Sequence, residues 1–332
     1  MRKVVLGRSN VKVSAISLGT WAYGGANTVG KFSVGWAGQS DEDSRKALLS
    51  AWQHGINHWD TADVYGEGRS ETIIGNMWDK VPRKDIFLAT KVGWDRGPHS
   101  HWYDPKHMLH NLDRSLNNLK TDCVDLVYLH HCNFGKNGEY FDGALEVIRK
   151  FKDQGKTRFI GLSDWSSDNI LKYIERCDPD VIQPYRNVMD DNYIESGLSS
   201  YVNINNIGVC FFSPLKHGLL TGKYDKPTSF ESGDHRSGIK DFTSQTIVHK
   251  MKQNKALLDQ RFANHSNPTM HGIVDALFNG VSSGCVLLGQ RNTRQVEVAA
   301  SLGNLMSEED SSWVMSLYKP QNLQQRHAHV RP

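Results

Sequence analysis

Residues 55–68 read GINHWDTADVYGEG, a short apolar run that ends at Asp60 and leads into a glycine-rich turn containing Tyr65. Further apolar runs of similar length recur along the chain, and amphipathic stretches separate most of them. In order, the runs cover residues 13–19, 56–60, 86–92, 124–130, 157–163, 180–185, 207–213 and 285–289. Strands that alternate with helices indicate a parallel sheet. Eight such units predict an α/β fold, a closed TIM-type (β/α)8 barrel in a single domain.

Two segments break this alternation. Residues 22–39 form a glycine-rich loop that carries Trp36, and residues 224–270 are polar and irregular, as expected for a long loop and a helix. An open doubly wound sheet is the competing fold, but it usually places G-x-G-x-x-G after the first strand, and LGTWAYGGAN at 18–27 does not fit. The barrel is expected over residues 1–318, with a disordered tail at 319–332.

Composition narrows the function classes. The 332 residues suit one α/β barrel, and Lys plus Arg exceed Asp plus Glu by only 39 − 36 = 3, which gives no electrostatic case for nucleic acid or an acidic membrane. No stretch approaches ~18 continuous apolar residues, and the N-terminus lacks the apolar core of a signal peptide. The widely spaced cysteines form no C-x-x-C pair, so we expect reduced thiols and a cytoplasmic protein. They are Cys123, Cys132, Cys177, Cys210 and Cys285.

Four polar side chains fall at or just after the ends of predicted strands: Asp60, Tyr65, Lys91 and His130. At one rim of a barrel, this set suits carbonyl reduction. A carbonyl that accepts a hydride needs a proton on its oxygen, and the phenol of Tyr65 can donate it. A neighbouring Lys91 ammonium should lower the pKa of that phenol from about 10, and Asp60 should keep Lys91 protonated.

His130 would then hydrogen-bond the carbonyl oxygen and orient the substrate. None of the four groups carries hydride, so a nicotinamide must supply it. A metal-dependent barrel hydrolase that uses Asp60, His130 and His131 is an alternative, disfavoured because no Cys or carboxylate stands beside the two histidines at ligand spacing. No metal is therefore expected.

At these residues the sequence resembles the aldo-keto reductases, over about residues 4–305. The matching stretches are LGTW (18–21), GINHWDTADVYG (55–66), ATKVGW (89–94), DLVYLHH (125–131), GKTRFIGLSDW (155–165), VIQPYRN (181–187), FSPLKHGLLTGKY (212–224), GDHR (233–236) and LLGQRNTRQVE (287–297). The resemblance implies an eight-stranded barrel that binds NADPH across its strand ends and reversibly reduces an aldehyde or ketone. It also implies that Asp60, Tyr65, Lys91 and His130 are the catalytic tetrad.

The resemblance further implies the cofactor contacts, which are Gly19, Thr20, Trp21, Asp60, Ser163, Asp164, Gln183, Phe212, Ser213, Pro214, Leu215, Gly218, Leu219, Gly289, Gln290, Arg291 and Gln295. Among them, Phe212 would stack on the nicotinamide, and Arg291 with Gln295 would lie near the adenosine 2′-phosphate, whose oxygens an Arg fork can bind in pairs. Val298 and Ala299 stand where a Glu-Asn pair is usual near the adenine, so NAD(H) stays open beside NADP(H).

The substrate is expected to be a small-molecule carbonyl or alcohol, held by Trp21, Trp36, Tyr65, Trp94, His130 and His131. The tryptophans could instead simply pack the loops onto the barrel. Asp164 stands where the family commonly has a carboxamide-binding Asn, and His131 where Trp often follows the catalytic His. The second functional alternative is a cofactor-binding regulatory subunit of the same fold, as in channel-associated β subunits. The sequence specifies no oligomeric state.

Overall fold

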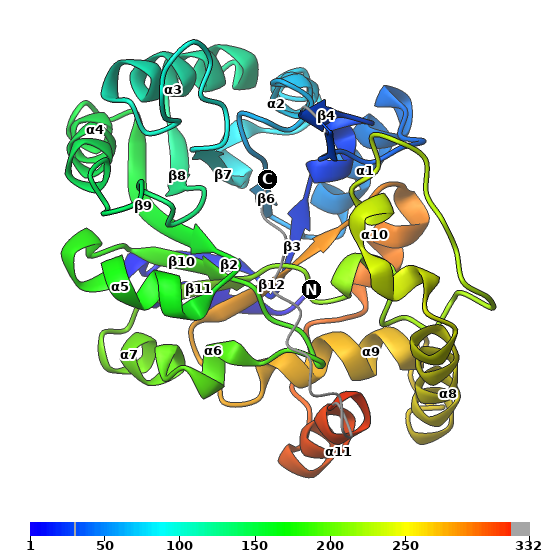
Figure 1. Cartoon of the computed structure of the whole chain (residues 1–332). Coiled ribbons are helices and arrows are strands. Elements are labelled where there is room, and N and C mark those ends of the chain that lie inside the picture. The colour runs from blue at the N-terminus through cyan, green and yellow to red at the C-terminus, as the bar shows by residue number, and fades with distance from the viewer. Residues whose placement is uncertain (30, 320–332) are drawn as a thin grey trace.

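The computed structural model describes residues 1–29 and 31–319. Eight parallel strands close into a barrel in the order β10-β11-β12-β3-β6-β7-β8-β9, and β9 pairs with β10 to complete the ring (Figure 1). The predicted (β/α)8 barrel is therefore confirmed. Its strands are β3 (Ile16–Gly19), β6 (His58–Asp60), β7 (Phe87–Val92), β8 (Val124–Leu129), β9 (Thr157–Asp164), β10 (Val181–Pro184), β11 (Gly208–Phe211) and β12 (Gly284–Gly289).

Helices surround the strands and cover the outer face of the barrel (Figure 1). They are α1 (Asp41–Gln53), α2 (Arg69–Gly75), α3 (Pro105–Leu119), α4 (Phe141–Asp153), α5 (Ser167–Cys177), α6 (Asn192–Glu195), α7 (Leu198–Ile204), α8 (Gln245–Arg261), α9 (Pro268–Asp275), α10 (Thr293–Ala300) and α11 (Glu308–Tyr318). The acidic run after Ser40 does begin a helix, since the Ser40 hydroxyl accepts a hydrogen bond from the Asp43 amide.

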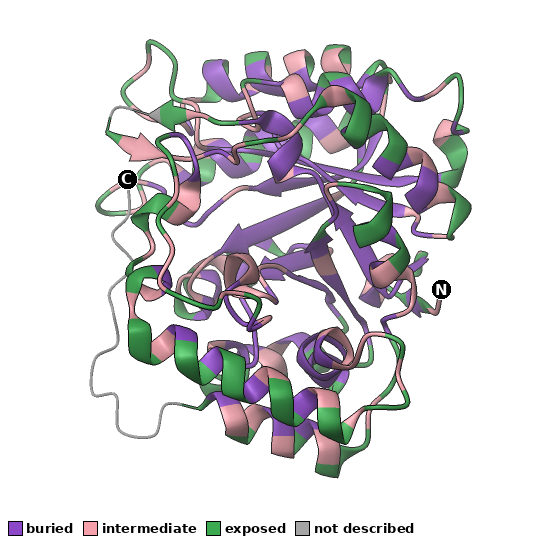
Figure 2. Ribbon diagram, turned by 90° about the vertical axis from the view of Figure 1, so that its right-hand side faces the viewer, coloured by how far each residue is buried: buried purple, intermediate pink, exposed green. Residues whose placement is uncertain are grey.

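Most residues of the barrel strands are buried, as Figure 2 shows by the purple strands at the centre of the molecule. The exceptions are Arg158 and Phe159 in β9 and Leu287 and Gly289 in β12. Every residue of β7 and β8 is buried, which explains why these strands read as continuous apolar runs. A charged side chain on such a strand leaves water completely. It is stable there only with a charged or hydrogen-bonding partner, and this requirement governs the site described below.

Two short antiparallel pairs lie outside the barrel: β1 (Lys3–Val5) with β2 (Lys12–Ser14), and β4 (Thr28–Val29) with β5 (Phe32–Ser33). The second pair belongs to the predicted loop 22–39, which is joined to the other irregular segment. The Asn27 amide donates to Gly233 O at 3.1 Å, and the His235 amide donates to Gly35 O at 2.8 Å. Two segments some 200 residues apart thus form one structure over the barrel.

The rest of the predicted segment 224–270 contains α8 and the start of α9, as expected. In the part of the chain that is described, no helix combines the length and apolar character needed to cross a bilayer. The tail predicted at 319–332 lies, except for Lys319, outside the described residues.

Candidate active site

Asp60 and Lys91 lie on neighbouring strands and face the barrel interior. The Lys91 ammonium donates to Asp60 Oδ1 at 2.5 Å, to the backbone oxygen of Thr61 at 2.7 Å and to the Tyr65 hydroxyl at 3.3 Å. The other oxygen of Asp60 accepts a hydrogen bond from Gln183 Nε2 at 2.8 Å. Each hydrogen of the ammonium has an acceptor, so the buried charge is fully satisfied.

Tyr65 follows β6 in a turn that a close backbone approach holds in place. Its neighbour Gly66 has φ +62°, and a Cβ there would lie 2.3 Å from the oxygen of Gly24. Only glycine fits both the left-handed conformation and that contact. The Tyr65 ring stacks near Trp21, with 6.1 Å between ring centroids, and meets His130 edge-on at 5.9 Å.

Burial and the neighbouring opposite charges shift the pKa values of Lys91 and Tyr65 in opposite directions. Burial lowers the pKa of Lys91, but Asp60 and Tyr65 outweigh it, so the pKa lies above its ordinary value. For Tyr65, burial raises the pKa, Lys91 lowers it, and the net shift is upward. The expected lowering is therefore wrong for the net shift, although Lys91 contributes with the expected sign, because desolvation of a phenolate is the larger effect. Tyr65 is a protonated phenol at neutral pH.

His130 directly follows β8 and completes the predicted group. Burial, Lys91 and His131 together hold its pKa well below the usual range, so its imidazole is neutral. Its Nδ1 atom is buried and makes no hydrogen bond within the described chain. Because Nδ1 is sealed from solvent, a ligand in the cleft does not reach that nitrogen in this structure.

His131 faces a different environment. It is 4% exposed and lies among aromatic rings, with centroid distances of 4.3 Å to Trp94, 4.9 Å to Trp102 and 5.6 Å to Tyr103. Its Nδ1 accepts a hydrogen bond from the Asn133 amide at 3.1 Å. The histidine pair is therefore divided between the tetrad and an aromatic cluster at the rim. Within residues 1–29 and 31–319, the ligand atoms of Asp60, His130 and His131 are not among those that lie close enough together to hold one ion.

A cleft of about 3450 Å³ runs over the carboxyl ends of the strands. Tyr65, His130, Trp21, Trp36 and Trp94 all line it. So do all the predicted cofactor residues but one. Leu219 is the exception, because its side chain is 1% exposed in the core beneath the loop. Lys91 also lies below the surface of the cleft, at 1% exposure, and reaches it through Tyr65.

The loop after β11 has an unusual backbone. Ser213, Lys216 and His217 all have positive φ, at 59°, 45° and 58°, and Gly218 follows at 89°. Such left-handed residues cost conformational energy outside glycine, and they persist where the surrounding structure fixes them. The segment lines the cleft and includes the predicted cofactor contacts Ser213, Leu215 and Gly218. Successive backbone amides in such conformations can form an anion-binding concavity.

At the predicted adenine end, the charged group is already engaged. Arg291 donates through Nε to Gln39 Oε1 at 2.9 Å and through Nη2 to the backbone oxygens of Ala37 at 2.8 Å and Gly38 at 2.6 Å. Gln295 accepts a hydrogen bond from the Arg291 amide at 2.8 Å. Arg291 therefore fastens loop 37–39 beside the cleft. Among the described residues no hydrogen bond occupies its Nη1 hydrogens, which are left for a ligand.

Two other predicted cofactor residues serve the protein itself. Asp164 accepts from the amides of Cys132 at 2.7 Å and Ser166 at 2.8 Å and from Asn169 Nδ2 at 3.2 Å, which fixes the ends of β8 and β9. Gln290 is 1% exposed, and its Nε2 donates to Ser17 O at 3.2 Å. Their side chains are hydrogen-bonded within the barrel wall.

The cleft also contains four residues for which the sequence predicted no role. Trp165, His217, His235 and Arg236 all line the cleft. His235 lies 5.0 Å from the Trp21 ring, and the Arg236 guanidinium lies 4.4 Å over the Trp36 ring. The motif GDHR at 233–236 is one of the stretches that resemble the family, but the sequence did not show where this segment lies in the fold.

Comparison with known proteins identifies the family to which this chain belongs. A model of the aldo/keto reductase family matches residues 15–318. The chain belongs to that family. Family membership makes the protein an oxidoreductase acting on CH–OH and C=O groups.

Among related proteins, an aldo-keto reductase of Schizosaccharomyces pombe whose name specifies NADP(+) is 34% identical over 209 residues, 60% of this chain and 60% of the relative. The match thus spans less than two thirds of that relative. A putative voltage-gated potassium channel subunit beta from the same yeast is 32% identical, over 77% of this chain and 72% of the relative. The glycerol dehydrogenase of Gluconobacter oxydans superposes with a TM-score of 0.78 at 25% identity, covering 95% of this chain and 94% of that structure.

Proposed function

We propose that this aldo-keto reductase uses NADPH to reduce an aldehyde or ketone reversibly, with Tyr65 as the proton donor in reduction and the acceptor in oxidation. The observation that carries the proposal is the buried chain from Asp60 through Lys91 to the Tyr65 hydroxyl, with distances of 2.5 and 3.3 Å, which opens onto the cleft beside His130. The substrate would be a small carbonyl or alcohol compound. The five free thiols support a cytoplasmic location.

The chain's donors fit a nicotinamide dinucleotide. The left-handed turn at 213–218 can present backbone amides to a pyrophosphate, and Arg291 Nη1 can reach an anionic ribose substituent. Ser163 on β9 and Gln183 on β10 are register partners and line the same cleft. When bound, the cofactor supplies the hydride.

The residues of the site would handle the proton and the charge. Tyr65, held protonated by burial, donates its proton to the oxygen that becomes an alkoxide. The resulting phenolate is stabilised by the Lys91 ammonium, whose own charge Asp60 balances. Neutral His130 donates one N–H to the same oxygen and orients the carbonyl.

The test is Tyr65→Phe, assayed with NADPH and 4-nitrobenzaldehyde. Reduction should fall by ~10²–10⁴-fold while the NADPH dissociation constant, measured by fluorescence titration, stays within about twofold. Tyr140→Phe is the matched control, since Tyr140 bonds Ser100 at 3.1 Å outside the cleft and should leave both values unchanged. Substantial turnover in Tyr65→Phe would refute Tyr65 as the donor.

The second candidate is a cofactor-binding regulatory subunit, which the similarity to a putative channel subunit favours. The same assay separates the two functions. NADPH binding without reduction of any aldehyde or ketone in a broad panel would support the regulatory function. Turnover that depends on Tyr65 supports the enzyme.

A further inference from the structure

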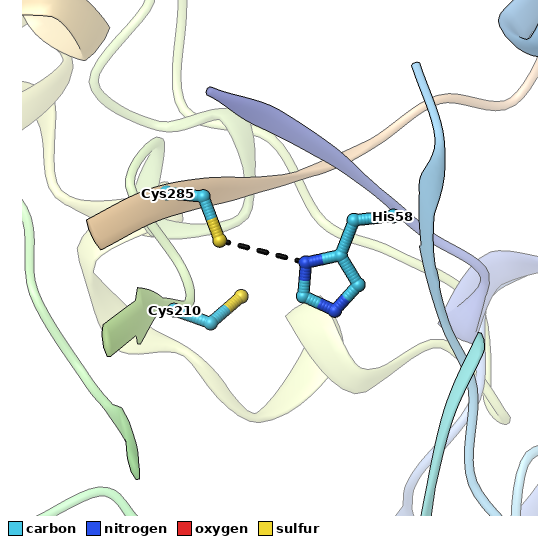
Figure 3. Close-up of side chains that lie close together, drawn as sticks. All are labelled: His58, Cys210 and Cys285. Atoms are coloured by element: carbon cyan, nitrogen blue, oxygen red, sulfur yellow. Dashed lines mark hydrogen bonds between the residues drawn. The ribbon is translucent and has the colours of Figure 1, made fainter. Parts of the chain in front are cut away.

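A cluster of three metal-ligating side chains lies inside the barrel, below the tetrad. His58 opens β6 two residues before Asp60, and residues two apart on a strand point to the same face. Cys210 on β11 and Cys285 on β12 are register partners on adjacent strands. All three side chains are 0% exposed, and Figure 3 shows both sulfurs turned toward the imidazole.

The spacing fits a single small ion. One ligand atom from each residue lies within 4.8 Å of the others, and Cys285 Sγ is 3.5 Å from His58 Nδ1. In a tetrahedral zinc site, bonds of ~2.3 Å to sulfur and ~2.0–2.1 Å to nitrogen place those two atoms about 3.6 Å apart. The Ser17 hydroxyl, also fully buried, lies 2.8 Å from the same Nδ1 and offers an oxygen on a third side.

We propose that His58, Cys210 and Cys285 bind a Zn²⁺ ion in the barrel core, with the Ser17 hydroxyl as the neighbouring oxygen donor. Two thiolates and an imidazole are a preferred ligand set for zinc. Charge selects the ion further, because two thiolates and one Zn²⁺ sum to zero, whereas Cu⁺ would leave a net negative charge in a core without water. Binding displaces both thiol protons, so the site loads more readily as pH rises.

The second ring nitrogen of His58, Nε2, is buried and makes no hydrogen bond within the described chain, whereas Nδ1 is the nitrogen beside Cys285 and Ser17. The polar atoms of the cluster thus converge on one point.

The ion would have a structural role. It would connect β6 to β12, from which only β3, the strand of Ser17, separates it in the barrel, and to β11, the next strand beyond β12. Because all its ligands are sealed from solvent, we expect the ion to bind as the barrel closes during folding and to exchange slowly afterwards. A chelator should therefore remove it from the unfolded chain but not from the native one.

The experiment uses the full chain, unfolded in guanidinium with chelator and a phosphine reductant, and refolded with or without ZnCl₂. Elemental analysis after desalting should give about one zinc per chain, and the zinc-refolded protein should melt at a higher temperature than the metal-free one. Refolding with Co²⁺ should produce thiolate-to-cobalt charge-transfer absorption and the intense visible bands of a tetrahedral ion. This wild-type comparison needs no variant to fold.

Cys285→Ala and Cys210→Ala should reduce bound zinc to background and abolish the cobalt spectrum, whereas Cys132→Ala and Cys177→Ala, also buried but outside the cluster, should retain both. The proposal is overturned if the refolded wild type holds no more zinc than Cys285→Ala. It is equally overturned if copper alone is retained, or if mass spectrometry without reductant shows a Cys210–Cys285 disulfide in the native protein as isolated.

Discussion

The carboxylate of Asp60 and the ammonium of Lys91 meet at 2.5 Å across neighbouring strands, with each side chain 1% exposed. Removing one partner of such a pair leaves an uncompensated buried charge, which typically costs about 3–5 kcal/mol. The pair is therefore both a structural element of the barrel and the support for Tyr65.

Lys91→Met should lower the free energy of unfolding by about 3–5 kcal/mol and abolish most carbonyl reduction. In the alcohol-oxidation direction, which needs the phenolate, the pH profile should move to higher pH, because the ammonium that lowers the Tyr65 pKa is gone. Adding Asp60→Asn should recover part of the stability, as Gln183 can still hydrogen-bond there, but none of the activity. An unchanged pH profile in a folded Lys91→Met protein would show that Lys91 has only a structural role.

The sequence was sufficient to predict that Asp60, Tyr65, Lys91 and His130 lie together, because they sit at or near strand ends, and parallel strands bring those ends to one rim. It was insufficient where the role of a residue depends on the path of a loop or on the direction of a side chain in the folded chain. Nothing local shows that Arg291 bonds Gln39, a residue 252 positions away, or that Leu219 packs inward. The His58, Cys210 and Cys285 cluster was missed for the same reason, since it exists only once the barrel has closed.

Asp63, fully buried two residues before Tyr65, should make the fold less stable as pH rises. Burial and then Glu71 raise its pKa well above the ordinary value. The folded state therefore holds a proton that the unfolded chain loses near pH 4, and stability falls from there up to the folded pKa, by at most about 1.4 kcal/mol per pH unit.

Asp63→Asn should remove this dependence, so its urea midpoint should decline less than that of the wild type between pH 4 and pH 8. Asp79→Asn, at an exposed position, is the control and should follow the wild-type curve. Parallel curves for the wild type and Asp63→Asn would show that Asp63 does not carry the proton.

Arg291→Ala should weaken NADPH more than NADH. A charge-assisted contact to the 2′-phosphate is worth roughly 1.5–3 kcal/mol, or roughly 10- to 100-fold in the dissociation constant. Because Arg291 also fastens loop 37–39, a smaller loss common to both cofactors is expected. Gln39→Ala removes a loop contact but keeps the guanidinium, so it should weaken the two cofactors equally. Equal weakening in Arg291→Ala itself would reject the assignment.

The aromatic walls of the cleft should favour hydroxylated cyclic or aromatic carbonyl compounds over long unbranched aliphatic aldehydes. Trp21 and Trp36 meet at 5.8 Å nearly perpendicular to each other, and His235 lies 5.0 Å from Trp21, so flat faces alternate with polar ring edges. Such faces suit C–H-rich rings whose hydroxyl groups keep polar contacts at their edges. The check is kcat/KM across both substrate classes for the wild type and Trp36→Ala. Trp36→Ala should lose the preference while retaining its turnover of short aldehydes, because Trp36 touches neither Asp60 nor Lys91. If straight-chain alkanals are preferred tenfold or more by the wild type, about 1.4 kcal/mol in transition-state free energy, the tryptophans only pack the loops and do not select the substrate.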